Sequence, residues 1–199
     1  MRTNERKTRQ PYANRQQLLR FSQDCIKAYK AGDDCPQMPE TWYASGDWTS
    51  AYSKLYSFWY GTGTGYDAFK PGNIKLPFWA FSTLPVITCP GMGACEFFCY
   101  SLKAWRHPHA FMRQLVNTLR LLTTAGRQQL ATAFHSLPIG STVRLYVDGD
   151  IDSKDTLRFW FGLVSARQDL AVYGYSKSWQ LFLDWQASGR EFPANYILN

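Results

Sequence analysis

The sequence predicts an α/β protein, a partial barrel-like or open parallel sheet with flanking helices, plus an N-terminal helical, aromatic-rich segment. The last third alternates apolar strand-like runs with amphipathic helical patterns, which is typical of parallel strands joined by helices. With 199 residues and 45% hydrophobic residues, the chain can also bury a full core. We expect a basic disordered arm over residues 1–11, a helical and aromatic segment over 12–69, and an α/β core over 70–199.

The N-terminal half predicts one long helix followed by an aromatic region. The helix spans about residues 14–30 and ends at Ala31-Gly32. Its apolar side chains lie roughly on one face: Leu18, Leu19, Cys25, Ile26 and Tyr29. The aromatic residues between 42 and 60 suit a short helix laid on the core. The alternative is that exposed rings stack on nucleic-acid bases.

A second strong helical pattern runs from about Pro108 to Ala125, with an apolar stripe at helical spacing. Four arginines recur every seven residues along it: Arg106, Arg113, Arg120 and Arg127. On an exposed face, such a row would match phosphates along a nucleic-acid backbone. The alternative is an ordinary solvated helix face.

Strand-like runs cover residues 143–147, 170–175 and 195–198, and helices are expected over about 154–166 and 179–186. Ligand sites in parallel sheets gather where the strands end. Asp148, Asp150, Ser176 and Lys177 follow two of the strands, which makes them candidate catalytic residues. Two carboxylates could hold a divalent cation for phosphodiester chemistry, and the lysine could stabilise developing negative charge. The alternative is a turn with a helix cap and an ion pair.

The net charge of +7 is concentrated in two regions. Residues 1–20 carry six Lys/Arg and one Glu, and residues 70–147 carry eight Lys/Arg and one Glu. We expect a nucleic-acid partner, with Lys75 and the four arginines as candidate contacts, and the alternative is a basic surface without a ligand. Because no signal peptide or membrane-length apolar run is present, we expect a soluble cytoplasmic protein without a membrane partner.

Cys89, Cys95 and Cys99 lie within eleven residues, spaced C-x5-C-x3-C behind a Pro-Gly turn. Three thiolates this close can converge on an iron–sulfur cluster or on zinc. Zinc would need a fourth ligand such as Cys35, His107 or His109. An iron–sulfur cluster could leave one iron open for a substrate, as in radical-SAM enzymes, but this chain lacks their usual C-x3-C-x2-C spacing. The alternative is buried free thiols.

Several motifs, taken in order, resemble the gene product 88 family of phage and plasmid proteins over about residues 70–199. They are Gly72-Asn73-Ile74-Lys75, Phe81–Pro85, the three-cysteine segment 88–100, Val143–Asp150, Tyr173–Ser178 and Pro193–Ile197. The chain departs from the family at its Asp148-Gly149-Asp150 turn and by having Ser176 in place of threonine. The resemblance implies a cytoplasmic protein of a mobile element with a partial-barrel core. It also implies relatives that extend beyond residue 197, so either a short version closes the sheet differently, or a protein partner or a further segment covers the edge of the last strand.

Three functions remain open at this point. The first is a phage- or plasmid-encoded nucleic-acid-binding accessory protein in replication, maintenance, transfer or interference with competing elements, with a possible Cys-ligated metal site. The second is a metal-dependent enzyme, using phosphodiester or iron–sulfur chemistry, with its site at the strand ends. The third is an inhibitor that binds a protein through the aromatic region 42–60.

Overall fold

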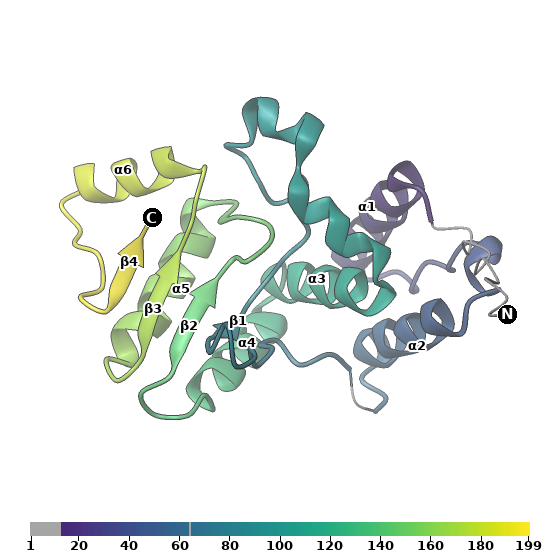
Figure 1. Ribbon diagram of the computed structural model, residues 1–199, viewed down its shortest axis with the longest axis horizontal. Coiled ribbons are helices and arrows are strands. Elements are labelled where there is room, and N and C mark those ends of the chain that lie inside the picture. The colour runs from purple at the N-terminus through teal and green to yellow at the C-terminus, as the bar shows by residue number, and fades with distance from the viewer. Residues whose placement is uncertain (1–12, 64) are drawn as a thin grey trace, which may run out of the picture.

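The computed structural model describes residues 13–63 and 65–199, so the expected basic arm over 1–11 lies outside the described residues. A helical half lies beside a half built on a sheet (Figure 1). The helices are α1 Arg15–Ala31, η1 Glu40–Trp42, α2 Gly46–Tyr60, η2 Gly93–Phe98, η3 Tyr100–Arg106, α3 Pro108–Leu121, α4 Thr124–His135, α5 Lys154–Ala166 and α6 Trp179–Ala187. The strands are β1 Trp79–Ala80, β2 Thr142–Leu145, β3 Ala171–Gly174 and β4 Tyr196–Leu198. None of the helices in the described ranges is both long and apolar enough to cross a membrane.

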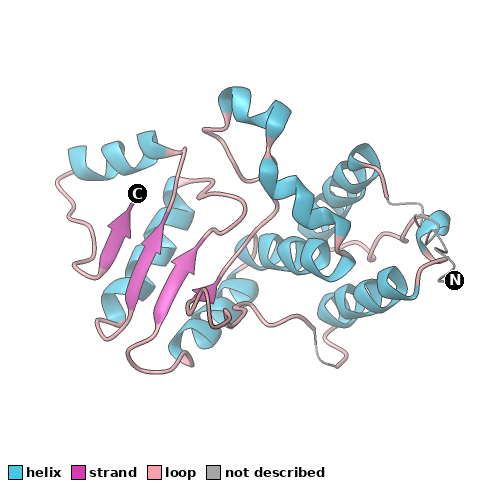
Figure 2. Ribbon diagram, in the orientation of Figure 1, coloured by secondary structure: helices cyan, strands magenta, loops and turns pink. Residues whose placement is uncertain are grey.

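The four strands form one parallel sheet in the order β1-β2-β3-β4. Figure 2 shows all four arrows pointing the same way. Every connection between neighbouring strands contains at least one helix, as parallel pairing requires. The prediction of a parallel open sheet with flanking helices is therefore confirmed.

The sheet buries one face against helices and leaves the other partly open. Val143, Leu145 and Val172 are buried with α4, α5 and α6 in a cluster centred on Trp160. Side chains alternate between the faces of a strand, so Arg144, between Val143 and Leu145, lies on the opposite face. Its paired neighbours in register are Ala80 on β1 and Tyr173 on β3.

The helical half has its own aromatic core. The α1 helix begins at a capping box, in which Asn14 and Gln17 exchange hydrogen bonds between side chain and main chain. Trp42, Trp48 and Tyr52 are buried against α1 and α3, and Cys25 is buried with them. The core interpretation of the aromatic region is thus confirmed for these rings, whereas Tyr56 and Tyr60 are 44% and 40% exposed. The core of this half includes α3, which the sequence assigned to the α/β part.

Three local predictions need correction. The helix expected over about 108–125 is two helices, because α3 ends at Leu121 and the Thr123 side chain caps a new helix by accepting from the Gly126 N–H. The two-residue strand β1 was not predicted, since two residues show no alternation. The strand expected to reach residue 147 ends at Leu145, because Tyr146 has φ +56°, outside the β region.

Candidate functional site

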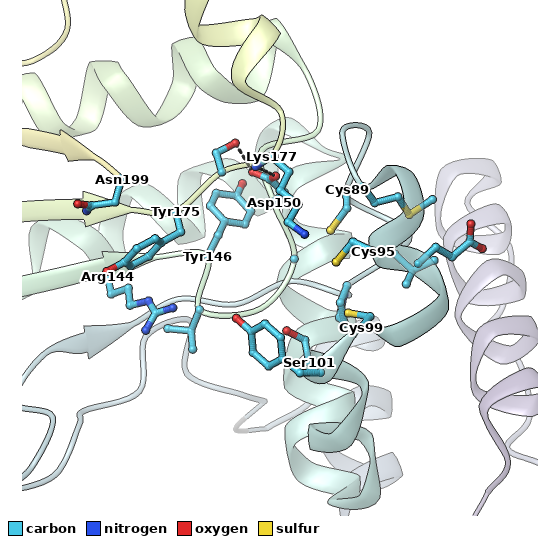
Figure 3. A pocket seen from close by; sticks show the side chains of 18 residues that line it. Cys89, Cys95, Cys99, Ser101, Arg144, Tyr146, Asp150, Tyr175, Lys177 and Asn199 are labelled. Carbon is cyan, nitrogen blue, oxygen red and sulfur yellow. Dashed lines mark hydrogen bonds between the residues drawn. The ribbon is translucent and has the colours of Figure 1, made fainter.

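A pocket of about 280 Å³ lies at the carboxyl ends of the strands. Apart from Arg144 within β2, its walls come from residues in the segments that follow the four strands: from 85–101 after β1, 146–147 and 149–150 after β2, 175–177 after β3, and Asn199 after β4. This is the position where parallel α/β sheets bind ligands. Figure 3 shows the labelled side chains around the pocket, with the cysteines on one side and Arg144 and Tyr175 on the other.

Cys89, Cys95 and Cys99 all line this pocket as free, half-buried thiols. Burial raises the pKa of the Cys89 thiol to about 11, the Val86 main chain offsets part of this, and the charges of Asp150 and the other two cysteines add to it. Figure 3 shows the sulfur atoms of Cys89 and Cys95 directed toward the pocket. Cys89 is therefore a protonated thiol at neutral pH, and binding a metal would displace its proton.

Glycine lets the cysteine segment lie directly against the loop after β3. A Cβ on Gly91 would lie 2.0 Å from the Lys177 carbonyl oxygen, which is far too close for any side chain. Lys177 extends its exposed side chain beside the cysteines, and of these Cys95 does most to raise the pKa of the Lys177 ammonium. The structure thus places a cation next to the three sulfur atoms.

The pocket offers three sulfur atoms as possible metal ligands. As they stand, no three His, Cys, Asp or Glu side chains in residues 13–63 and 65–199 are close enough together to hold a metal ion. The thiols nevertheless share one pocket, and thiolates are the usual ligands of iron–sulfur clusters. Cys35 is buried in the helical half, and His109 Nδ1 lies 2.9 Å from the Tyr66 hydroxyl. Among the described residues, no fourth cysteine and no histidine lines the pocket.

Asp150 lines the pocket but both of its oxygens already accept hydrogen bonds. Oδ1 accepts from the Ser176 hydroxyl at 2.7 Å and from the Ile151 N–H at 2.7 Å. Oδ2 accepts from the N–H groups of Lys177 at 2.8 Å and Ser178 at 3.1 Å. The structure brings Asp150, Ser176 and Lys177 together as predicted, with Asp150 holding the loop that carries the other two.

Asp148 faces away from the other predicted site residues. Its Oδ2 accepts from Gln114 Nε2 of α3 at 3.0 Å, and Gln114 Oε1 in turn accepts from the buried Trp105 indole at 2.8 Å. Burial raises the pKa of the Asp148 carboxyl, partly offset by Ser101, Arg144 and Gln114. The pocket is lined by Val147, Gly149 and Asp150, and Asp148 is outside it. The expected pair of carboxylates in one mouth is therefore not formed, because the turn directs the two side chains to different elements.

The family comparison agrees with the resemblance seen in the motifs. A family model described as Gene product 88 matches residues 49–199. The chain belongs to the gene product 88 family. The match begins in α2, about twenty residues before the motifs that suggested the family. Comparisons with curated proteins and with solved structures return no match.

In this member of the gene product 88 family, the predicted row of arginines is not a free cationic face. Arg120 donates to Asn117 Oδ1 at 3.0 Å and to the Tyr66 carbonyl, and burial lowers the pKa of its guanidinium to about 10. Arg127 pairs with Asp155 at 2.6 Å, and Arg113 lies over the Tyr66 ring. Arg106 is exposed, as is Lys75, which lies far from α3 in the sequence. The row was expected on one exposed face, but three of its members pack against the protein itself.

Sequence reasoning missed several residues that line this pocket. Arg144 lines the pocket, and a charged residue inside an apolar strand was the signal that could have identified it. Val86 and Tyr146 also line it, and they are the two non-glycine residues with positive φ in the described chain, at +71° and +56°. Such strained backbone clusters at functional sites, and nothing in the local sequence indicates it.

Proposed function

We propose that this protein is an enzyme that uses Cys89, Cys95 and Cys99 to hold an iron–sulfur cluster and acts on a small molecule bound beside it. The observation that carries the proposal is that all three thiols line one pocket at the carboxyl ends of four parallel strands. With three thiolates and no pocket cysteine or histidine as a fourth among the described residues, one iron would remain open. A closed four-ligand zinc site is less well supported for the same reason.

The residues around the cysteines would prepare the site in specific ways. Lys177 would place positive charge beside the sulfur atoms and so offset part of the negative charge of a thiolate-bound cluster. The Gly91 contact and the hydrogen bonds of Asp150 would hold the cysteine segment and the Lys177 loop together. When bound, the cluster would supply electron transfer or activation at its open iron, and the half-enclosed pocket would hold the substrate there.

The test is metal analysis of the full chain after anaerobic purification, combined with an absorption spectrum. We expect about four iron and four sulfide per chain with broad visible absorption. Cys89→Ser, Cys95→Ser and Cys99→Ser should each lose most of the iron. Cys35→Ala is the matched control, because Cys35 lies in the helical core away from the pocket, and it should retain the iron. Stoichiometric zinc, or a metal-free protein after anaerobic reconstitution, would overturn the proposal.

Nucleic-acid binding by a phage- or plasmid-encoded accessory protein remains a second proposal, supported by the charge of residues 1–20 and 70–147. Three of the four arginines that suggested this function make contacts within the protein. The net positive charge of the two regions is therefore its main support. Affinity for DNA or RNA that falls steeply with salt would support it. No binding at low ionic strength would exclude it.

A further inference from the structure

Arg144 is a cation in the wall of the pocket opposite the cysteines, and no residue of the described ranges forms an ion pair with it. It lies on the open face of β2, and its guanidinium is 5.0 Å from the centre of the Tyr175 ring and 5.9 Å from that of Phe78. In Figure 3 it lies with Tyr175 across the pocket from Cys89 and Cys95. Both rings lie within cation–π distance of the guanidinium group.

The hydrogen-bonding capacity of Arg144 is not used within the described part of the chain. Its Nε is buried and has no hydrogen-bond partner there. None of the ion pairs found among residues 13–63 and 65–199 includes it. Asp148 is close enough to Arg144 for the guanidinium to favour the charged form of the Asp148 carboxyl. The Asp148 and Arg144 side chains are nevertheless not within ion-pair distance, and Asp148 Oδ2 accepts from Gln114. A buried donor without a partner is costly unless a ligand satisfies it.

We propose that the pocket binds a small organic carboxylate, with the carboxylate on Arg144 and the rest of the molecule directed toward Cys89, Cys95 and Cys99. Any reaction of this carboxylate at the cysteines rests on the proposed function, whereas its binding to Arg144 does not. The fork of a guanidinium matches a planar carboxylate with two parallel hydrogen bonds. Val86, Tyr146 and Tyr175 line the same pocket, so a molecule with an apolar body and one anionic end fits it.

A carboxylate fits this wall better than a phosphate. Phosphate sites usually combine several donors, often main-chain N–H groups of a loop or helix start. The N–H groups of Lys177 and Ser178, which could have served, already donate to Asp150. That leaves one guanidinium fork at this end of the pocket, which suits a single negative charge.

The test compares benzoate with its neutral analogue benzamide in ligand-observed NMR titrations of the full chain, with iron measured on the same samples. We expect benzoate to bind at least about tenfold more tightly than benzamide, because only benzoate pairs with the guanidinium. In Arg144→Met this ratio should fall below about twofold, and in Arg144→Lys it should be intermediate, because lysine keeps the charge but not the fork. Arg190→Met is the matched control: Arg190 is exposed and stacks on Trp185 at 4.9 Å, outside the pocket, so the ratio should not change.

The outcomes separate this inference from the proposed function. If the protein prefers benzoate but holds no iron, the carboxylate site is supported and the iron–sulfur cluster is excluded. A protein with iron and no preference for benzoate over benzamide overturns the carboxylate site alone, and this result needs no variant. Displacement of benzoate by an equal concentration of inorganic phosphate would also overturn the assignment to a carboxylate.

Discussion

Asp150 and Lys177 stand at the ends of neighbouring strands, and the Lys177 main-chain N–H donates to Asp150 Oδ2 at 2.8 Å. The same carboxylate accepts from the Ser176 hydroxyl and the Ser178 N–H, so it fixes the whole turn after β3 to the end of β2. Because Asp150 is only 4% exposed, water cannot easily replace it. This contact sets the position of Lys177 beside the cysteines.

Asp150→Asn should lower the free energy of unfolding by about 2–3 kcal/mol, because an amide nitrogen would replace an oxygen that buried donors require. Urea denaturation followed by circular dichroism measures the change. Asp152→Asn, at an exposed position in the same turn, is the control and should change stability by less than about 0.5 kcal/mol. Equal stability of Asp150→Asn and the unmodified protein would show that the carboxylate does not hold the loop.

Gly91→Ala should destabilise the protein by about 1–3 kcal/mol and reduce its iron content, because the added methyl would overlap the Lys177 carbonyl oxygen. Gly93→Ala is the matched control in the same segment. A methyl group added at Gly93 would meet no atom within 4 Å, and only the positive φ of +47° disfavours alanine there. We therefore expect a loss of about 1 kcal/mol in stability and retained iron. Iron per chain and urea unfolding are measured on both variants. Equal iron loss in the two would mean that the contact with Lys177 is not required.

Cys89 in metal-free protein should react with iodoacetamide about tenfold more slowly at pH 8 than an unstructured cysteine peptide. A thiol pKa of about 11 in place of 9.0 makes the thiolate about a hundredfold scarcer, and the greater nucleophilicity of a more basic thiolate recovers part of that. Mass spectrometry of the modified peptide gives the rate, which should keep rising up to about pH 11. Reaction as fast as the free peptide at pH 8 contradicts this prediction.

Asp148→Asn should raise the melting temperature at pH 7. Burial raises the pKa of this carboxyl in the folded state, so the folded protein binds its proton more tightly than the unfolded chain. Stability is therefore lost as pH rises from the ordinary value of 3.8 through the raised pKa, and it stays lower above that. Asparagine has no such penalty and can still accept from Gln114. The advantage of the variant should shrink to nothing as pH falls below 3.8, and an advantage that grows on acidification would exclude this explanation.

Arg106→Ala and Arg120→Met separate nucleic-acid binding from internal packing. If the protein binds DNA through Arg106, its loss should reduce the slope of log K against log salt by about 0.9, the value for one phosphate contact. Arg120→Met should leave that slope unchanged but lower stability by about 2 kcal/mol, since its hydrogen bonds to Asn117 and Tyr66 are lost. The opposite pattern, with Arg120 controlling the slope, would show that the arginine row binds the phosphates after all.

Much of this architecture was predictable because its causes are local. The helix at Arg15–Ala31 follows from its apolar spacing and the glycine after it, and the helix at Lys154–Ala166 follows from the apolar spacing behind its cap. Alternation of strands and helices was sufficient for the parallel sheet. The placement of Asp150 and Lys177 at neighbouring strand ends then followed from geometry.

The errors arose where long-range contacts override local pattern. The heptad spacing of Arg113, Arg120 and Arg127 puts them on one side of a continuous helix, but a break after Leu121 and internal partners for all three remove the row. Asp148 and Asp150 lie in the same short turn, and it is contact with Gln114 for the first and with the 176–178 loop for the second that gives them different surroundings.

By itself, the sequence determined the fold class, the family resemblance, and a group of three cysteines within eleven residues, because these depend on periodicity, order and spacing along the chain. Only the tertiary structure decided that the cysteines line a pocket at the strand ends and that Arg144 lies across from them with no ion-pair partner among residues 13–63 and 65–199. The physical reason is that these positions depend on the pairing of β1, β2 and β3, whose residues are far apart in the chain and come together only when the core is packed.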